Sequence, residues 1–103
     1  MRFLTLRYFN AVAKLGSIRK AADRLHVAPS AVSRQIAQLE HELDAILFER
    51  SKSGVRLTAA GEVLARQSHR IFRDIDRARA GIDDLRGLRR GDALNVMQMS
   101  ASS

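Results

Sequence analysis

Four residues in the first third of the chain have side chains suited to contacting a nucleic acid. Pro29 is the only proline in the sequence, and Ser30, Ser33 and Arg34 follow it within two helical turns. Serine hydroxyls donate or accept hydrogen bonds at base edges and phosphates, and arginine can bind guanine through two parallel hydrogen bonds. Small residues with little charge would let this helix end approach base pairs closely. The pattern therefore indicates a helix whose N-terminal turns enter the major groove of DNA.

Each of these side chains also has a plainer interpretation. Ser30 and Ser33 could simply cap or solvate a helix start. Arg34 could pair with Gln38 or Glu42 on its own helix. Further basic residues could bind phosphates without base preference or be ordinary solvated side chains; they are Arg50, Lys52 and Arg56, and more weakly Arg19 and Lys20.

Catalysis finds little support in the sequence. There is no cysteine, and no nucleophile-elbow pattern surrounds any serine, threonine or lysine. The three histidines, His26, His41 and His69, lack the spacing of metal ligands, and no phosphate-binding glycine motif is present. We therefore expect a protein that is not an enzyme and that needs no metal or cofactor.

The charge of the chain favours a polyanionic partner. Its 103 residues carry a formal net charge of +7, from 18 Lys+Arg against 11 Asp+Glu. Residues 1–57 hold 10 basic and 5 acidic groups, so most of the excess lies in the first half. A basic domain of this size indicates nucleic acid, although a soluble protein that is merely basic gives the same totals. No apolar run is long enough to span a membrane, and charged residues interrupt the N-terminal apolar stretch, so we expect a cytoplasmic protein.

Apolar spacing and capping residues predict three short helices. The first covers about 3–15 and ends at Gly16, and Ser17 then caps a second helix over about 18–25. The third begins at Pro29, where the missing N–H costs nothing. The residues expected to be buried are Leu6, Phe9, Val12 and Ala13 in the first helix, Ala21, Ala22 and Leu25 in the second, and Val32, Ile36, Leu39 and Leu43 in the third.

A hairpin and a long helix follow. Turn residues Ser51-Lys52-Ser53-Gly54 between apolar stretches predict a hairpin, or wing, over about 47–57. Thr58 caps a long helix over 59–90 with an apolar heptad seam, which favours pairing with a second copy over packing on its own domain. The seam residues are Leu64, Ser68, Ile71, Ile75, Ala78, Ile82 and Leu85. Residues 93–99 could start a strand.

Two runs carry a specific resemblance. GSIRKAADRLHVAPSAVSRQIAQLEHEL, followed by LFERSKSGVRLTAAGE, resembles the N-terminal domain of LysR-type transcriptional regulators up to about Gly91. The resemblance implies a mainly α fold: a winged helix-turn-helix over 1–58, with its helix-turn-helix at about 18–37, and a dimerising linker helix over 59–90. Residues 91–103 would then begin an effector-binding domain that is missing here, or form a disordered tail. A small-molecule effector is expected only for the full-length protein.

The resemblance also implies roles for single residues. It places DNA contacts at Pro29, Ser30, Ser33, Arg34, Arg50, Lys52 and Arg56, and dimer contacts at Leu64, Ile71, Ile75, Ala78, Ile82 and Leu85. Two positions depart from the family pattern. Ala28 stands where many members have a glutamine that could read a base, and Asp44 stands where many have glycine.

The function expected from these observations is sequence-specific DNA binding by a transcriptional regulator. A homodimer would place two recognition helices in the major grooves of an inverted repeat, with the wings near the minor groove. A tetramer is conceivable for a full-length protein. The alternatives are an architectural, non-specific nucleic-acid binder and a coiled-coil interaction protein whose basic head is incidental.

Overall fold

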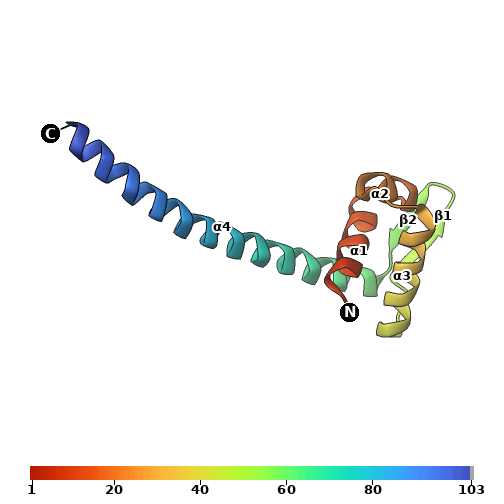
Figure 1. The fold of residues 1–103 in the computed structure, drawn as a ribbon. Coiled ribbons are helices and arrows are strands. Elements are labelled where there is room, and N and C mark those ends of the chain that lie inside the picture. The colour runs from red at the N-terminus through yellow and green to blue at the C-terminus, as the bar shows by residue number, and fades with distance from the viewer. Residues whose placement is uncertain (103) are drawn as a thin grey trace. The chain divides into compact units, whose positions relative to one another are not determined.

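The computed structural model describes the backbone of residues 1–102 and the side chains of residues 1–88. A compact unit covers Met1–Arg70, and the remainder of α4 forms a second unit. In chain order the elements are α1 (Phe3–Leu15), α2 (Ile18–Leu25), α3 (Pro29–Leu43), β1 (Phe48–Ser51), β2 (Gly54–Leu57) and α4 (Ala59–Ser102) (Figure 1). The predicted winged helix-turn-helix followed by a long helix is confirmed.

The core of the compact unit lies between the first three helices and the hairpin. The apolar stripes predicted from a 3.6-residue period face the core, where most of their residues are buried. α2 packs against both α1 and α3. Ala21 and Ala22 are fully buried, as expected for small residues at a close helix crossing. Phe9 of α1 meets Phe48 of β1 with ring centroids 5.2 Å apart, which ties the hairpin to the helices.

Three positions predicted to be buried in the helices lie further out. Leu43 is 40% exposed, and Ala13 and Leu25 are only half-buried. The residue that continues the buried stripe of α3 is Leu47, 1% exposed, which enters the core from the loop after the helix. The last turn of α3 therefore does not contribute an apolar side chain to the core, and the prediction for Leu43 was wrong.

The helix ends follow the predicted local signals, with one addition. Gly16 closes α1 in the left-handed conformation (φ 65°), and the Ser17 hydroxyl accepts the Lys20 N–H at the start of α2. Asp44 closes α3 with φ 49°, in the position where glycine would be unstrained. His26 closes α2 in the same way with φ 59°, which the sequence did not indicate.

The predicted wing is a two-stranded antiparallel hairpin. Phe48 pairs with Leu57 and Ser51 with Gly54, which leaves Lys52 and Ser53 in the turn. Gly54 has φ 128° and lies close to the end of α1. A Cβ at this position would come within 2.4 Å of the Gly16 carbonyl oxygen, so a side chain does not fit. The Val55 N–H donates to that same carbonyl oxygen at 3.1 Å. The second strand is thus fixed to the end of α1 by its backbone.

The long helix differs from the prediction at its C-terminal end. It continues to Ser102, whereas an end near residue 90 was expected and a strand was considered for residues 93–99. Alanine, leucine, methionine and glutamine in that stretch are good helix formers, and a strand needs a paired neighbour that the described part of the chain does not offer there. Gly87 and Gly91 lie inside the helix, where each costs about 1 kcal/mol relative to alanine but leaves the backbone bonds intact.

The start of α4 packs tightly on the loop before the wing. The Thr58 hydroxyl accepts the Gly61 N–H at 3.0 Å, which confirms Thr58 as the cap. The Thr58 N–H donates to the Leu47 carbonyl at 2.9 Å. A Cβ on Gly61 would lie 2.1 Å from that carbonyl oxygen and 2.9 Å from a methyl group of Leu57. Glycine at position 61 is therefore required by contact rather than by its φ angle.

We predict that Gly61→Ala destabilises the compact unit by about 1–3 kcal/mol, because backbone rather than a flexible side chain must move. Gly87→Ala is the matched control, since no atom lies within 4 Å of its added Cβ. It should leave stability unchanged or raise it by up to about 1 kcal/mol. Thermal and denaturant unfolding would measure both variants, and equal effects would contradict the packing described for Gly61.

Candidate nucleic-acid interface

The N-terminal end of α3 presents an open polar surface. Ala28 precedes the helix in an extended conformation and offers no side-chain cap, and Pro29 occupies the first turn. Within the described part of the chain the Ser30 N–H has no hydrogen-bond acceptor. This contrasts with α2, whose first turn is capped by Ser17. The first turn of α3 therefore keeps a backbone donor available to an external group.

The predicted contact residues of α3 lie away from the core. Val32, Ile36 and Leu39 are buried, whereas Ser30 and Arg34 are exposed. Pro29 is exposed as well, and Ser33 is half-buried at the edge of this face. The serine and arginine side chains make no hydrogen bond to other described residues. The separation into an apolar face and a polar face follows from the helical period and leaves the polar face uncovered within the compact unit.

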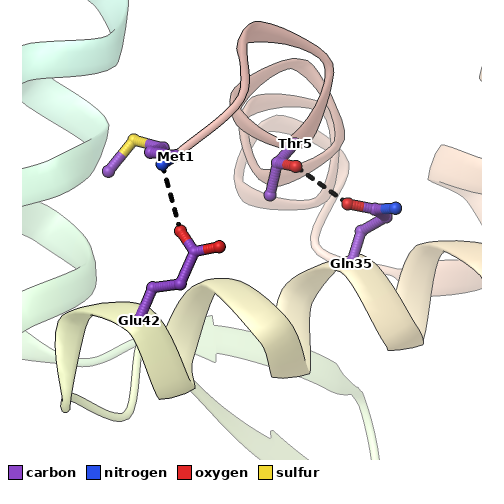
Figure 2. Close-up of polar contacts among 4 residues, drawn as sticks. All are labelled: Met1, Thr5, Gln35 and Glu42. Atoms are coloured by element: carbon purple, nitrogen blue, oxygen red, sulfur yellow. Dashed lines mark hydrogen bonds and ion pairs between the residues drawn. The ribbon is translucent and has the colours of Figure 1, made fainter.

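The alternative pairing of Arg34 is absent from the described chain. Glu42 instead accepts the N-terminal ammonium of Met1, with 3.2 Å between nitrogen and oxygen (Figure 2). Gln38 makes no hydrogen bond with Arg34 among the described residues. The guanidinium of Arg34 is therefore exposed and has no intramolecular partner there. It is in a state to bind an external acceptor.

A buried threonine positions α3 against α1. The Thr5 hydroxyl donates to the Gln35 side-chain oxygen at 2.8 Å, joining residues 30 positions apart (Figure 2). Thr5 is 5% exposed and Gln35 is half-buried, so this hydrogen bond is partly shielded from water. Sequence reasoning did not find this pair. A polar residue inside the apolar stripe of α1 was the available signal.

The three basic wing residues do not share one face. Successive side chains along a strand point to opposite faces of the hairpin, whereas two residues paired across the strands share a face. Arg50 lies opposite Val55, on the same face as Phe48, while Arg56 lies opposite Glu49 on the other face. Lys52 lies in the turn between the strands, and all three basic side chains are exposed. A single flat surface cannot meet both arginines equally.

A carboxylate fixes the wing relative to α3. One side-chain oxygen of Glu40 accepts the N–H of Leu47 at 2.7 Å and that of Phe48 at 3.4 Å. Residues 44–47 form the link from α3 to β1. Hydrogen bonds to a charged acceptor are roughly twice as strong as neutral ones. Glu40 was not singled out from the sequence, because nothing local distinguishes it from a solvated helix residue.

The heptad stripe of α4 divides at the edge of the compact unit. Ser68, predicted as a seam residue, is fully buried and donates to the Ala65 carbonyl at 3.1 Å and to the Asn10 side-chain oxygen at 3.5 Å. It is therefore occupied within its own unit. Leu64 is half-buried there too, whereas Ile71, Ile82 and Leu85 are 41%, 52% and 63% exposed. Of the remaining predicted seam residues, Ala78 is exposed and Ile75 half-buried.

Neither a metal site nor a membrane span is found among the residues that the structure describes. They contain no group of three or more histidine, cysteine or acidic side chains close enough to hold an ion. None of their helices is both long and apolar enough to cross a bilayer.

The sequence matches a known family of DNA-binding proteins. Residues 3–62 match the model of the LysR family of bacterial regulatory helix-turn-helix proteins. The chain belongs to the LysR family. Among LysR-family relatives, the transcriptional regulator ClcR of Pseudomonas putida is 45% identical over 82 residues, covering 78% of this chain and 28% of ClcR. The present chain thus spans less than a third of the length of ClcR.

Two solved structures of LysR-family DNA-binding domains in complex with DNA have the same fold. The CbnR domain matches with a TM-score of 0.69 and 44% identity, over 79% of this chain and 98% of that one. The BenM domain, bound to catB site 1 DNA, matches with a TM-score of 0.78 and 34% identity, over 82% and 96%. Both likenesses cover most of the present LysR-family chain.

We predict that Glu40→Ala destabilises the compact unit by about 1–3 kcal/mol, because two amides of the wing link lose their charged acceptor. Glu42→Ala on the same helix is the control. Its partly exposed ion pair with the N-terminus should contribute about 0–1 kcal/mol. Denaturant unfolding would compare the two, and an equal loss for both variants would show that Glu40 does not hold the wing.

Proposed function

We propose that this chain is the DNA-binding part of a LysR-type transcriptional regulator that recognises a specific DNA sequence. The observation that carries the proposal is the uncovered polar face at the start of α3, where Ser30 and Arg34 have no partner within the described chain. Two similar domains have been solved with DNA bound. Relatives of the chain are named as transcriptional regulators, so the proposal assigns it no catalytic role. We also propose that the protein works in the cytoplasm, where it would meet its DNA.

In the proposed complex, α3 enters the major groove. Arg34 would bind guanine through paired hydrogen bonds or grip a phosphate, while Ser30 and Ser33 bond base edges or phosphates. Pro29 would bring the backbone of the first turn close to the DNA. Arg50, Lys52 and Arg56 would contact phosphates near the minor groove, the two arginines from opposite faces of the wing, and add affinity that does not depend on sequence.

The proposed dimer is formed by the apolar stripe of α4. Exposed leucine and isoleucine at heptad spacing leave a stripe that water does not solvate well, and pairing with a second copy would bury it. A symmetric dimer would bring two recognition helices to the two halves of an inverted repeat. Since the relatives are about three times longer, an effector-binding domain and a small-molecule effector belong to the proposal for the whole protein.

Titration against DNA separates this proposal from the two alternatives. A site selected by the chain from random DNA, and a scrambled version of it, would be titrated over a range of salt concentrations. Specific binding requires a large preference for the selected site. Equal affinity for both DNAs would favour the architectural binder, and no binding at physiological salt would favour the coiled-coil interaction protein.

We predict that Arg34→Ala weakens binding to the selected site by about 1–3 kcal/mol, with little change on scrambled DNA, because a base contact is lost. Lys52→Ala is the contrasting variant. It should weaken both DNAs alike and reduce the salt dependence by about one unit, as expected for one phosphate contact. Fluorescence anisotropy would measure both. Unchanged affinity of Arg34→Ala for the selected site would remove Arg34 from the reading surface.

We predict that Ile75→Asp releases monomers, because it introduces a charge into the proposed seam. Ala80→Asp carries the same charge on the opposite face of the helix and should leave the dimer intact. Sedimentation velocity at several protein concentrations would distinguish the two variants. Persistence of the dimer in Ile75→Asp would show that the copies pair elsewhere.

A further inference from the structure

Glu49 stands out among the segments proposed to meet DNA. Residues 28–38 and 48–57 contain arginine, lysine and small polar side chains, and Glu49 is their one acidic residue. A carboxylate at a phosphate-binding surface repels the ligand. Neither the core nor the contacts of the wing explain its presence, because the Glu49 side chain is exposed and makes no hydrogen bond or ion pair with other described residues.

The hairpin register places Glu49 directly opposite Arg56. The neighbouring pairs are Phe48 with Leu57 and Arg50 with Val55. Because Phe48 packs on Phe9, its face of the hairpin is turned to the core, and Glu49 and Arg56 project from the other face. Directly opposite residues have Cβ atoms about 4.5–5.5 Å apart. The carboxylate and guanidinium therefore share one small patch of the exposed face.

The two charges partly offset one another at that patch. They are not locked together, since no ion pair joins them, so the guanidinium stays free to contact an incoming phosphate. A phosphate that approaches Arg56 also approaches the carboxylate of Glu49. The attraction is then smaller than it would be for an arginine alone. Arg50 and Lys52 have no acidic residue opposite them in the hairpin.

We propose that Glu49 weakens phosphate binding by Arg56 and so limits the affinity of the wing for DNA of any sequence. This inference rests on the proposed DNA-binding function. By lowering the contribution that carries no sequence information, Glu49 leaves a larger share of the binding free energy to the reading residues of α3. Glu49 thus lowers the affinity for the selected and the scrambled DNA alike, and the ratio of the two affinities stays the same.

Two other roles for Glu49 make different predictions. A carboxylate can accept a hydrogen bond from the cytosine amino group, in which case its removal would weaken binding to the selected site alone. A cross-strand charge pair can also stabilise the hairpin, in which case its removal would lower the unfolding temperature and leave DNA binding unchanged. The test must separate these roles from the proposed one.

The test is a double-mutant cycle of four proteins: the unmodified chain, Glu49→Gln, Arg56→Gln and the combination. Affinities for the selected and scrambled DNAs would be measured over a series of salt concentrations. Glu49→Gln should tighten binding to both DNAs by about 1.5- to 5-fold and steepen the salt dependence by up to about 0.9 units. The gain should vanish in the Arg56→Gln background. Glu49→Ala should behave like Glu49→Gln, because charge is the cause.

Glu62→Gln is the matched control, since it removes the same charge from an exposed position in the first turn of α4. A gain of equal size in Glu62→Gln, or one that persists without Arg56, would overturn the inference in favour of a general charge effect. A loss confined to the selected site, or no change in DNA binding, would overturn it too. If the unmodified chain binds neither DNA, the proposed function itself fails, which is a distinguishable result.

Discussion

The hydrogen bonds from the Leu47 and Phe48 amides to the Glu40 carboxylate are the constraint on which the arrangement of helix and wing depends. Glu40 lies on α3, and the two amides lie where the chain enters β1. Amides at a partly buried loop need an acceptor, and a charged one is strong enough to fix the loop without regular structure. The spacing between the polar face of α3 and the basic wing is set through this contact.

Backbone contacts with two glycines complete that constraint. The Leu47 carbonyl accepts the Thr58 N–H and lies so close to α4 that only glycine fits at position 61. At the other strand, the Gly16 carbonyl accepts the Val55 N–H and excludes a Cβ from Gly54. Both strands of the wing are thus held by main-chain atoms, which adapt less than side chains do. In the proposed DNA complex, a surface held in this way is already formed before DNA binds, which lowers the entropic cost of binding.

Local signals explain what the sequence could predict. Gly16, Ser17 and Pro29 act on neighbouring residues, so the helix bounds they indicate agree with the structure. The polar face of α3 could also be predicted, because the helical spacing of its apolar residues can be recognised within the segment itself. The roles of Glu40 and of the Thr5–Gln35 pair could not be predicted, because each depends on residues brought together only by folding. The same holds for the opposed faces of the two wing arginines, which depend on the strand register. The C-terminal part of α4 has residues compatible with either a helix or a strand. Whether a strand forms there depends on a neighbouring strand with which it could pair.

The heptad stripe of α4 is buried near one end and mostly exposed along the rest of its described length. Ser68, Ile75 and Ile82 are spaced seven residues apart, yet Ser68 is buried against Asn10 of α1 while Ile82 is exposed. A small hydroxyl at position 68 allows close packing inside the compact unit, and larger apolar side chains follow where that unit ends. A periodic pattern in the sequence therefore does not show by itself which part of it is left for a partner. The burial of Ser68 implies that the surface available to a second copy begins near Ile71, so that the same helix face first closes the domain and then, in the proposed dimer, joins two of them.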